Sequence, residues 1–380
     1  MSTHRKSIFY LLFPFTVWYA VGVAIRNLLW DTGIRKQQTP HITTIGVGNL
    51  ATGGTGKTPM VEYILSLFCH EMHVAMLSRG YGRDTKGFII ADQYNADANT
   101  IGDEPAMMAR KFPSVTTVVS ENRLLAISNL QNLNNPPDIV VLDDIYQHRW
   151  LKPTVNILLT EYNRPYFSDR ILPYGNLREF RTAHSRANII VVTKSPLDIP
   201  PLDRRNFIAR LGVKPHQRVF FAHILYHQPQ PLWTETPDCQ VTTLDLSLPH
   251  NILLLTGIAN PSPLLAHLKH THSVTHLSFP DHHQFTADDI QTIVDSFAAL
   301  PNDQPRAIVT TEKDAARLVS SPHADLLRQL PIYQLPISME FNSANGETFD
   351  NAISTIVREN ISFLQRLAGS PYFRDTQFDA

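Results

Sequence analysis

The stretch from Gly48 to Met60, GNLATGGTGKTPM, constrains this chain more than any other. It follows an apolar, β-branched run, HITTIGVGN, and leads into TPMVEYILSLFCH, whose apolar residues have helical spacing. The pattern G-x-x-x-x-G-K-[ST] of phosphate-binding loops fits at Gly56, Lys57 and Thr58, but Ala51 replaces the first glycine. An ordinary glycine-rich turn is the alternative. The strand before the loop and the helix after it favour nucleotide binding.

The chemistry of such a loop depends on its backbone and on two side chains. Consecutive N–H groups point at the phosphates, and the glycines permit the tight turn. We expect Lys57 to reach the β- and γ-phosphates and Thr58 to bind Mg²⁺, while the helix that begins near Pro59 directs its positive end at the anion. The expected nucleotide-binding residues are Thr52, Gly53, Gly54, Thr55, Gly56, Lys57 and Thr58.

A second acidic feature fits the same chemistry. The apolar run in DIVVLDD ends in Asp143 and Asp144, and a nucleotide site of this kind needs a carboxylate at the end of a neighbouring strand. We expect Asp143, with Thr58, to hold Mg²⁺ and Asp144 to organise the site or act in catalysis; the two aspartates can exchange these roles. A solvated strand end is the alternative, and the apolar run before the pair argues against it.

Composition limits the remaining function classes. The chain has 380 residues with a formal net charge of −1, so it carries no overall field that would attract nucleic acid. Its two cysteines, Cys69 and Cys239, have no paired spacing, which fits a reducing compartment. We therefore do not expect nucleic acid as a partner, and no obligate protein partner is evident from the sequence.

The N-terminal segment is unusual in its apolarity. From Ser7 to Ile25 no residue is charged, and basic residues flank the segment on both sides. As a helix it would reach roughly 29 Å, about the thickness of a bilayer core. A signal peptide and a buried helix are two alternatives, but export does not suit an ATP site. Aromatic residues such as Trp18 and Tyr19 favour an uncleaved helix at the membrane, either spanning it or lying in the interface.

Apolar runs alternate with helical patterns along the first 200 residues, which predicts an α/β fold. We expect a P-loop NTPase-like, mostly parallel sheet with helices on both faces, a smaller α/β lobe and an N-terminal membrane helix. A proline-rich stretch, SPLDIPPLDRRN, suggests a boundary. The expected segments are 1–30 for the membrane helix, 31–205 for the kinase-like core, 206–345 for the smaller lobe and 346–380 for a C-terminal helix that packs on the core.

Several polar clusters lie at predicted strand or loop ends. In chain order they are SRGYGR, GDEP, DDIYQHRW, LPYGNLREF, FPDHH and TTEKDAARL. Together with VGNLATGGTGKTP and the N-terminal LLFPFTVWYAVGVAIRNLLWDTG, they resemble the tetraacyldisaccharide 4'-kinases, the lipid A 4'-kinases of Gram-negative bacteria. The resemblance extends to about Leu318. Three residues depart from the family pattern: Ile145 replaces a glycine in the DDxxQH motif, and Asn176 and Phe180 replace prolines around LRE.

The resemblance implies an activity and a location. Such an enzyme transfers the γ-phosphoryl group of ATP, with Mg²⁺, to the 4'-hydroxyl of a tetraacylated glucosamine disaccharide 1-phosphate. Its partners are this glycolipid and the membrane surface, and its place is the cytoplasmic face of the bacterial inner membrane. The alternative from another class is a membrane-associated P-loop ATPase or GTPase switch that acts on a protein. No [NT]-K-x-D element supports a guanine-specific switch.

The resemblance also implies roles for residues outside the phosphate loop. Asp103, oriented by His282, is expected to accept the proton of the sugar hydroxyl, and Asp144 is the other candidate base. A helix N-cap is the ordinary alternative for Asp103. Further candidates for binding substrate or balancing charge are Arg79, His148, Arg178 and Glu179.

Overall fold

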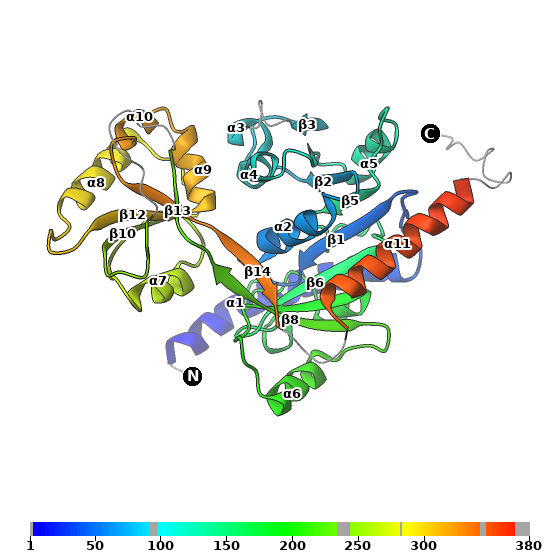
Figure 1. Ribbon diagram of the computed structural model, residues 1–380. Coiled ribbons are helices and arrows are strands. Elements are labelled where there is room, and N and C mark those ends of the chain that lie inside the picture. Colours follow the sequence, from blue (N-terminus) through cyan, green and yellow to red (C-terminus); the bar gives the residue numbers. More distant parts are fainter. Residues whose placement is uncertain (1–2, 92–96, 234–243, 282, 343–346, 369–380) are drawn as a thin grey trace.

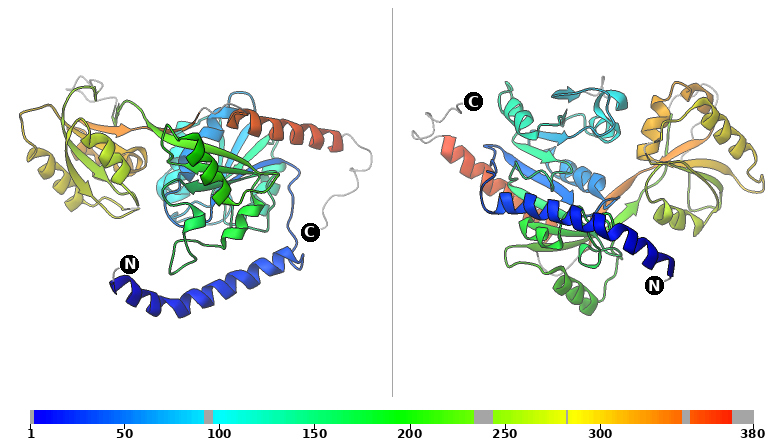
Figure 2. Two further views of the ribbon diagram at one scale, coloured as in Figure 1. Left: turned by 90° about the horizontal axis from the view of Figure 1, so that it is seen from below. Right: turned by 180° about the vertical axis from the view of Figure 1, so that it is seen from behind.

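The computed structural model describes residues 3–91, 97–233, 244–281, 283–342 and 347–368. Figure 1 shows two lobes side by side, each built on its own sheet, and Figure 2 shows a long N-terminal helix that runs along the outside of the larger lobe. The predicted α/β class with a mostly parallel sheet and a smaller second lobe is confirmed.

The larger lobe contains a nine-stranded sheet in the order β14-β8-β7-β6-β1-β5-β2-β4-β3. Neighbours from β8 to β4 are parallel, and only the edge strands β14 and β3 run antiparallel to their partners. The strands are β1 (Thr43–Asn49), β2 (Val74–Ser78), β3 (Ile89–Ala91), β4 (Thr116–Val119), β5 (Ile139–Leu142), β6 (Val155–Glu161), β7 (Ile189–Thr193), β8 (Arg218–Tyr226) and β14 (Ile337–Phe341).

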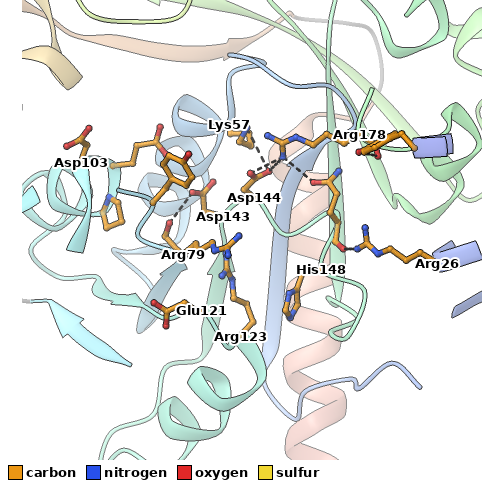
Figure 3. A pocket seen from close by; sticks show the side chains of 16 residues that line it. Arg26, Lys57, Arg79, Asp103, Glu121, Arg123, Asp143, Asp144, His148 and Arg178 are labelled. Atoms are coloured by element: carbon orange, nitrogen blue, oxygen red, sulfur yellow. Dashed lines mark hydrogen bonds and ion pairs between the residues drawn. The ribbon is translucent and has the colours of Figure 1, made fainter. Parts of the chain in front are cut away.

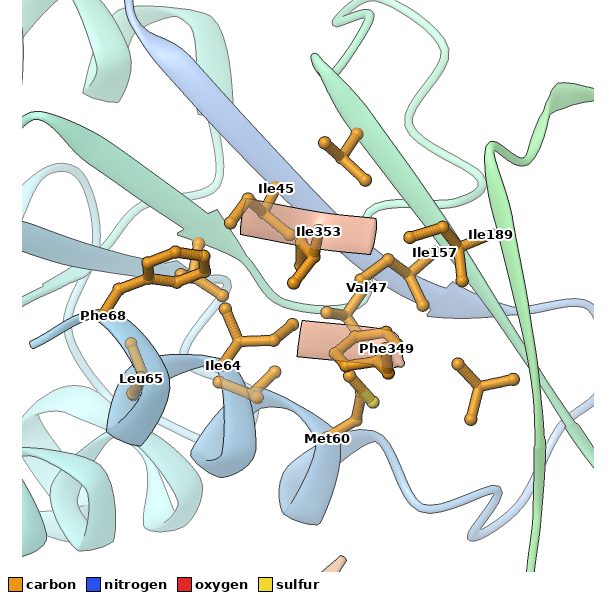
Figure 4. Packing of buried hydrophobic residues seen from close by; sticks show 14 of the residues in the cluster. Ile45, Val47, Met60, Ile64, Leu65, Phe68, Ile157, Ile189, Phe349 and Ile353 are labelled. Carbon is orange, nitrogen blue, oxygen red and sulfur yellow. The ribbon is translucent and has the colours of Figure 1, made fainter. Parts of the chain in front are cut away.

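Helices cover both faces of this sheet, as the apolar strands require. The larger-lobe helices after the N-terminal one are α2 (Lys57–Phe68), α3 (Ala98–Ile101), α4 (Asp103–Lys111), α5 (Arg123–Gln131), α6 (Pro201–Leu211) and α11 (Phe349–Ala368), with short 3₁₀ turns at Tyr166–Ser168 and Arg181–Arg186. On one face, α2 and α11 pack against the central strands through Ile45, Ile64, Ile157 and Ile353, all buried (Figure 4). Residues of α5 and α6 pack on the opposite face.

Two glycines in β1 bring a loop directly onto the sheet. A Cβ at Gly46 would lie 2.6 Å from Ile145 Cγ2, and one at Gly48 would lie 2.7 Å from Tyr146 Cβ. The chain after β5 therefore crosses closely over β1, which places the residues that follow Asp143 beside the phosphate loop. Ile145, which departs from the family pattern, is buried in this contact.

The smaller lobe has a five-stranded sheet in the order β11-β10-β12-β13-β9, parallel except for β9. Its strands are β9 (Gln230–Pro231), β10 (Asn251–Thr256), β11 (Ser273–Ser278), β12 (Arg306–Thr311) and β13 (Ile332–Leu335). Its helices are α7 (Ser262–Lys269), α8 (Ala287–Ala298), α9 (Glu312–Ser320) and α10 (Ala324–Leu327). In Figure 1, α9 lies on the side of this lobe that faces α4.

The chain leaves the larger lobe after β8 and returns to it in β14. These two strands pair antiparallel, from Tyr226 opposite Ile337 to Ala222 opposite Phe341, and both belong to the larger sheet. The division of the chain into four segments with the bounds given above stays a prediction.

The N-terminal helix α1 (Thr3–Asp31) has one side against the larger lobe and one side exposed. Val23 and Trp30 are buried, and Trp30 packs edge-on against Trp150 at 4.6 Å between ring centroids. The exposed side is strongly apolar and includes Phe13, Phe15, Val17, Trp18, Val21, Ile25 and Leu28. Across the described residues, none of the helices combines the length and the apolarity that crossing a bilayer requires.

Candidate active site

The predicted phosphate-binding loop joins β1 to α2. Gly53 and Gly56 have φ angles of 102° and 87°, a region that glycine enters easily and other residues rarely adopt. Thr55 anchors the middle of the loop, because its carbonyl accepts from Thr193 Oγ1 at 2.9 Å and its hydroxyl accepts from Asn49 Nδ2 at 2.6 Å. The sequence pattern is thus realised as a strand, a tight loop and a helix whose positive end faces the loop.

Alanine at position 51 fits this loop without strain. Ala51 is buried and forms an antiparallel bridge with Leu177. Its φ angle is not positive. The next residue, Thr52, donates its backbone N–H to the carbonyl of Asn176 at 2.8 Å. The start of the loop is therefore held by the LREF segment, and this position does not need the left-handed backbone that favours glycine.

The two predicted aspartates stand at the carboxyl end of the central strand β5. Asp144 has a φ of 46°, an uncommon backbone state for a residue other than glycine. Its carboxylate lies 3.1 Å from Arg178 Nη1 and 3.9 Å from Lys57 Nζ. Figure 3 shows these three side chains pointing toward one another. The structure therefore brings the loop lysine, the second aspartate and Arg178 together.

The side chain of Asp143 is largely shielded from solvent. Its carboxylate accepts a hydrogen bond from Ser78 Oγ at 3.3 Å. Burial first, and then the negative charges of Glu104 and Asp144, raise the pKa of Asp143 well above its usual value. A cation bound beside this carboxylate would relieve both effects.

A cavity of about 740 Å³ opens around these residues (Figure 3). It brings together most of the predicted side chains: Lys57, Arg79, Asp103, Asp143, Asp144, His148 and Arg178 all line it. The side chains of Tyr19 and Arg26 also reach it, so α1 contributes to the same cavity as the phosphate loop. Tyr19 donates to the carbonyl of Arg178 at 3.0 Å, and Arg26 donates to the carbonyl of Gln147.

Three arginines gather near His148 on one side of the cavity. Burial first, and then the positive charges of Arg123, Arg26 and Arg79, lower the pKa of His148 to about 4. His148 is therefore neutral near pH 7 and can both donate and accept a hydrogen bond. The cluster presents several positive charges in a protein with a net charge of −1, which suits a ligand with its own anionic group.

Asp103 is the first residue of α4, and the N-cap position belongs to Gly102. The alternative interpretation of Asp103 as the N-cap residue is thus wrong. Its carboxylate lies on the cavity and forms an ion pair of 2.7 Å with Arg317, from the smaller lobe. The predicted partner His282 lies outside the described residues.

Several other predicted residues lie away from the cavity lining, Glu179 and Thr58 among them. Glu179 is fully buried and pairs with Arg186 at 2.8 Å, so the structure gives it a role in holding the LREF segment. Thr58 is in the first turn of α2, half-buried, next to Lys57. The cavity lining includes Lys57 and none of the other loop residues.

Sequence reasoning missed several residues of the cavity. Those missed are Tyr19, Arg26, Ser78, Tyr81, Glu104, Pro105, Glu121, Arg123 and Gln147. Ser78 and Tyr81 lie in SRGYGR, Glu104 lies in GDEP and Gln147 lies in DDIYQHRW, so these motifs are the signal that the sequence offers for them. Arg123 opens the amphipathic helix α5, where a basic residue carries no signal of its own.

The donors present fit magnesium better than a metal that needs a complete protein cage. Among the described residues, no group of three or more His, Cys, Asp or Glu side chains could hold a metal ion. Mg²⁺ commonly takes one or two carboxylates, completes its shell with water and substrate phosphates, and prefers oxygen ligands. Asp143 and Asp144 supply this kind of incomplete oxygen set on the cavity that Lys57 also lines, and Thr58 follows Lys57 in the first turn of α2.

Comparisons with known proteins agree with this geometry. A family model described as tetraacyldisaccharide-1-P 4'-kinase matches residues 8–357. The tetraacyldisaccharide 4'-kinase of Bacteroides thetaiotaomicron is 42% identical over 95% of this chain and 96% of its own length. That of Phocaeicola vulgatus is 40% identical over 92% of this chain and 95% of its own.

A solved structure extends the likeness to the fold. LpxK from Aquifex aeolicus, described as an "apo" form in complex with ATP, has a TM-score of 0.67 and 25% identity, and the match covers 94% of this chain and 100% of that one. The family match spans nearly the whole chain, and both relatives are at least 40% identical to it over the aligned residues. The chain therefore belongs to the tetraacyldisaccharide-1-phosphate 4'-kinase family.

Proposed function

We propose that this protein is an ATP-dependent kinase that phosphorylates the 4'-hydroxyl of a tetraacylated glucosamine disaccharide 1-phosphate, in lipid A biosynthesis. The observation that carries the proposal is the shared cavity. Lys57 of the phosphate loop, the aspartates after β5, Asp103 and two residues of α1 all line one space. A donor nucleotide and a membrane-bound acceptor can therefore meet there.

In this proposal the phosphate loop and Lys57 hold the phosphates of ATP. Asp143, with Asp144 and Thr58, would hold Mg²⁺, and the bound ion would supply positive charge next to the transferred group. Lys57 and Arg178 lie beside Asp144, so they can balance charge where the γ-phosphate would stand. These assignments rest on oxygen donors and cations that converge at the carboxyl ends of β1 and β5.

The acceptor would bind in the same cavity, in contact with other residues that line it. Asp103 accepts the proton of the sugar hydroxyl as that oxygen attacks the γ-phosphorus, and the bond between phosphorus and the β–γ bridging oxygen breaks to release ADP. His148 and the arginines near it provide hydrogen bonds and positive charge for the sugar and its 1-phosphate. Asp144 is the second candidate for the base.

We place the enzyme at the cytoplasmic face of the bacterial inner membrane, with α1 lying in the interface. Its exposed apolar side can enter the acyl boundary, while Tyr19 and Arg26 remain at the cavity. The competing expectation, a P-loop switch that acts on a protein, is not favoured by the family to which the chain belongs.

Replacing Lys57 tests the assignment of the phosphate site. Lys57→Ala should lower kcat at least about 10²-fold, because it removes a positive charge from the transferred phosphoryl group. Steady-state kinase assays, with circular dichroism as a check on folding, measure this. Lys214→Ala, an exposed lysine after α6, is the matched control and should keep wild-type activity. Substantial turnover by folded Lys57→Ala protein would refute the assignment.

A further inference from the structure

Three ion pairs connect α9 of the smaller lobe with the larger lobe. Arg317 pairs with Asp103 at 2.7 Å, Glu312 pairs with Lys111 at 2.9 Å, and Lys313 pairs with Glu104 at 3.4 Å. The first of these differs from the others because its acidic member is the residue proposed above as the catalytic base.

The guanidinium of Arg317 is fixed by its own lobe. Nη1 donates to the carbonyl of Gly257 at 3.1 Å and to Asp314 Oδ1 at 2.9 Å. Asp314 is fully buried, and its other oxygen accepts from Gly257 N at 2.9 Å and from Thr311 Oγ1 at 2.8 Å. All of these hydrogen bonds lie within the smaller lobe. The direction of the Arg317 guanidinium is therefore set by residues of its own lobe.

The remaining donors of Arg317 converge on a single oxygen. Nε lies 2.9 Å and Nη2 lies 2.7 Å from Asp103 Oδ2. The Arg317 side chain is only 7% exposed, and that of Asp103 is 21% exposed. A charge-assisted pair with so little water around it restrains the carboxylate far more than an exposed pair would. Asp103 is the first residue of α4 and lines the cavity. The contact with Arg317 therefore orients a side chain of the cavity lining.

We propose that Arg317 is a positioning residue that orients the carboxylate of Asp103 from the smaller lobe, so that the base is aligned only when the lobes meet. The inference rests on the proposed function, since it needs Asp103 as the base. Arg317 does not line the cavity, so its role would be exerted through its ion pair with Asp103.

A purely mechanical contact between the lobes is the competing explanation, and Glu312 provides the control for it. Glu312→Gln removes the charge that pairs across the lobes with Lys111, while Lys111 keeps its other partner, Glu62, at 2.6 Å. This change weakens the lobe contact without touching Asp103. If Arg317 only holds the lobes together, both substitutions should harm the enzyme in the same way.

The experiment is a double-mutant cycle in kcat, measured with the full chain, ATP and the acylated acceptor. Asp103→Asn should cost roughly 10²–10⁴-fold. Arg317→Met should cost at least about tenfold in kcat and leave the KM for ATP nearly unchanged, because loss of alignment acts on the chemical step. Arg317→Lys should recover part of the loss. In the Asp103→Asn background, Arg317→Met should cost less than about threefold, since residues that act as a unit are not additive.

The outcomes separate the inference from the proposed function. Wild-type kcat in Asp103→Asn overturns the base assignment itself. If Asp103→Asn is defective but the kcat losses of Asp103→Asn and Arg317→Met are fully additive, the positioning role alone is overturned. A kcat loss in Glu312→Gln equal to that in Arg317→Met overturns it as well. Melting temperatures identify any variant that fails to fold. If Arg317→Met does not fold, Arg317→Lys takes its place in the double-mutant cycle. Additive kcat losses in that cycle overturn the inference in the same way.

Discussion

Asp143 combines a functional position with an unfavourable environment. Burial and the neighbouring carboxylates raise the pKa of Asp143 to about 7. An acid whose pKa is higher in the folded than in the unfolded state contributes stability at low pH, and this contribution is lost as the pH rises through the folded pKa. The ionised carboxylate near pH 8 therefore lowers the stability of the protein when no metal is bound.

Asp143→Asn should thus stabilise the protein without Mg²⁺ and nucleotide at pH 8, and the gain should shrink toward pH 4. The same substitution should remove Mg²⁺-dependent turnover, because the amide is a weaker metal ligand. Urea denaturation across this pH range measures the first effect. Ser66→Ala, on the outer side of α2, is the control. If the Asp143→Asn protein is less stable than wild type at pH 8, the favourable contacts of this carboxylate outweigh the cost of burying its charge, and the prediction is wrong.

Individual residues were predictable where a motif specifies chemistry. Lys57, Asp143 and Asp144 could be named because phosphate and magnesium sites need those groups after particular strands, whereas Arg178 was a candidate only through the family resemblance. Arg123 could not, since its approach to the cavity depends on how α5 packs. Ala51 shows the reverse case, because only the backbone conformation reveals that a glycine is unnecessary there.

The helix α1 has a surface with no covering partner among the described residues of the chain. Phe15 and Trp18 are 64% and 78% exposed, although both are large and apolar. Full burial of such a side chain is worth about 1.5–3 kcal/mol, so two of them can add substantially to binding at a membrane interface.

Replacing both Phe15 and Trp18 with Ser should weaken sedimentation with anionic liposomes by at least about tenfold, by that area argument. The KM for the acylated acceptor should rise, and the KM for ATP should stay the same. Leu202→Ser on α6, where the leucine is 68% exposed, is the matched control and should leave both properties unchanged. Undiminished pelleting of the double variant would contradict the interfacial role of α1.

Strands and helices with strong patterns were predictable, but their partners were not. The runs at Thr43–Asn49, Ile139–Leu142 and Ile189–Thr193 were identified as strands from their apolar residues. β14 is not predicted as a strand from the sequence. Nothing in its five residues indicates that it pairs with β8, more than a hundred positions earlier. Strand pairing at such separation is decided by the packing of the whole lobe.

The arrangement of the two lobes explains why the site could be predicted only in part. The phosphate loop, the aspartates and α1 belong to the larger lobe, where the loop and the aspartates follow the neighbouring strands β1 and β5. Arg317 reaches Asp103 from 214 positions away along the chain, through the contact between α4 and α9. Local patterns carry no information about such a contact.

The fate of the γ-phosphate of ATP tests the central claim most directly. Purified protein is incubated with γ-labelled ATP, Mg²⁺ and the acylated disaccharide 1-phosphate in mixed micelles, and the products are separated by thin-layer chromatography. We predict that the label moves into the lipid, that this requires Mg²⁺, and that Lys57→Ala abolishes it. Release of the label only as free phosphate, at the same rate with and without the lipid, would contradict the claim that this protein is a lipid kinase.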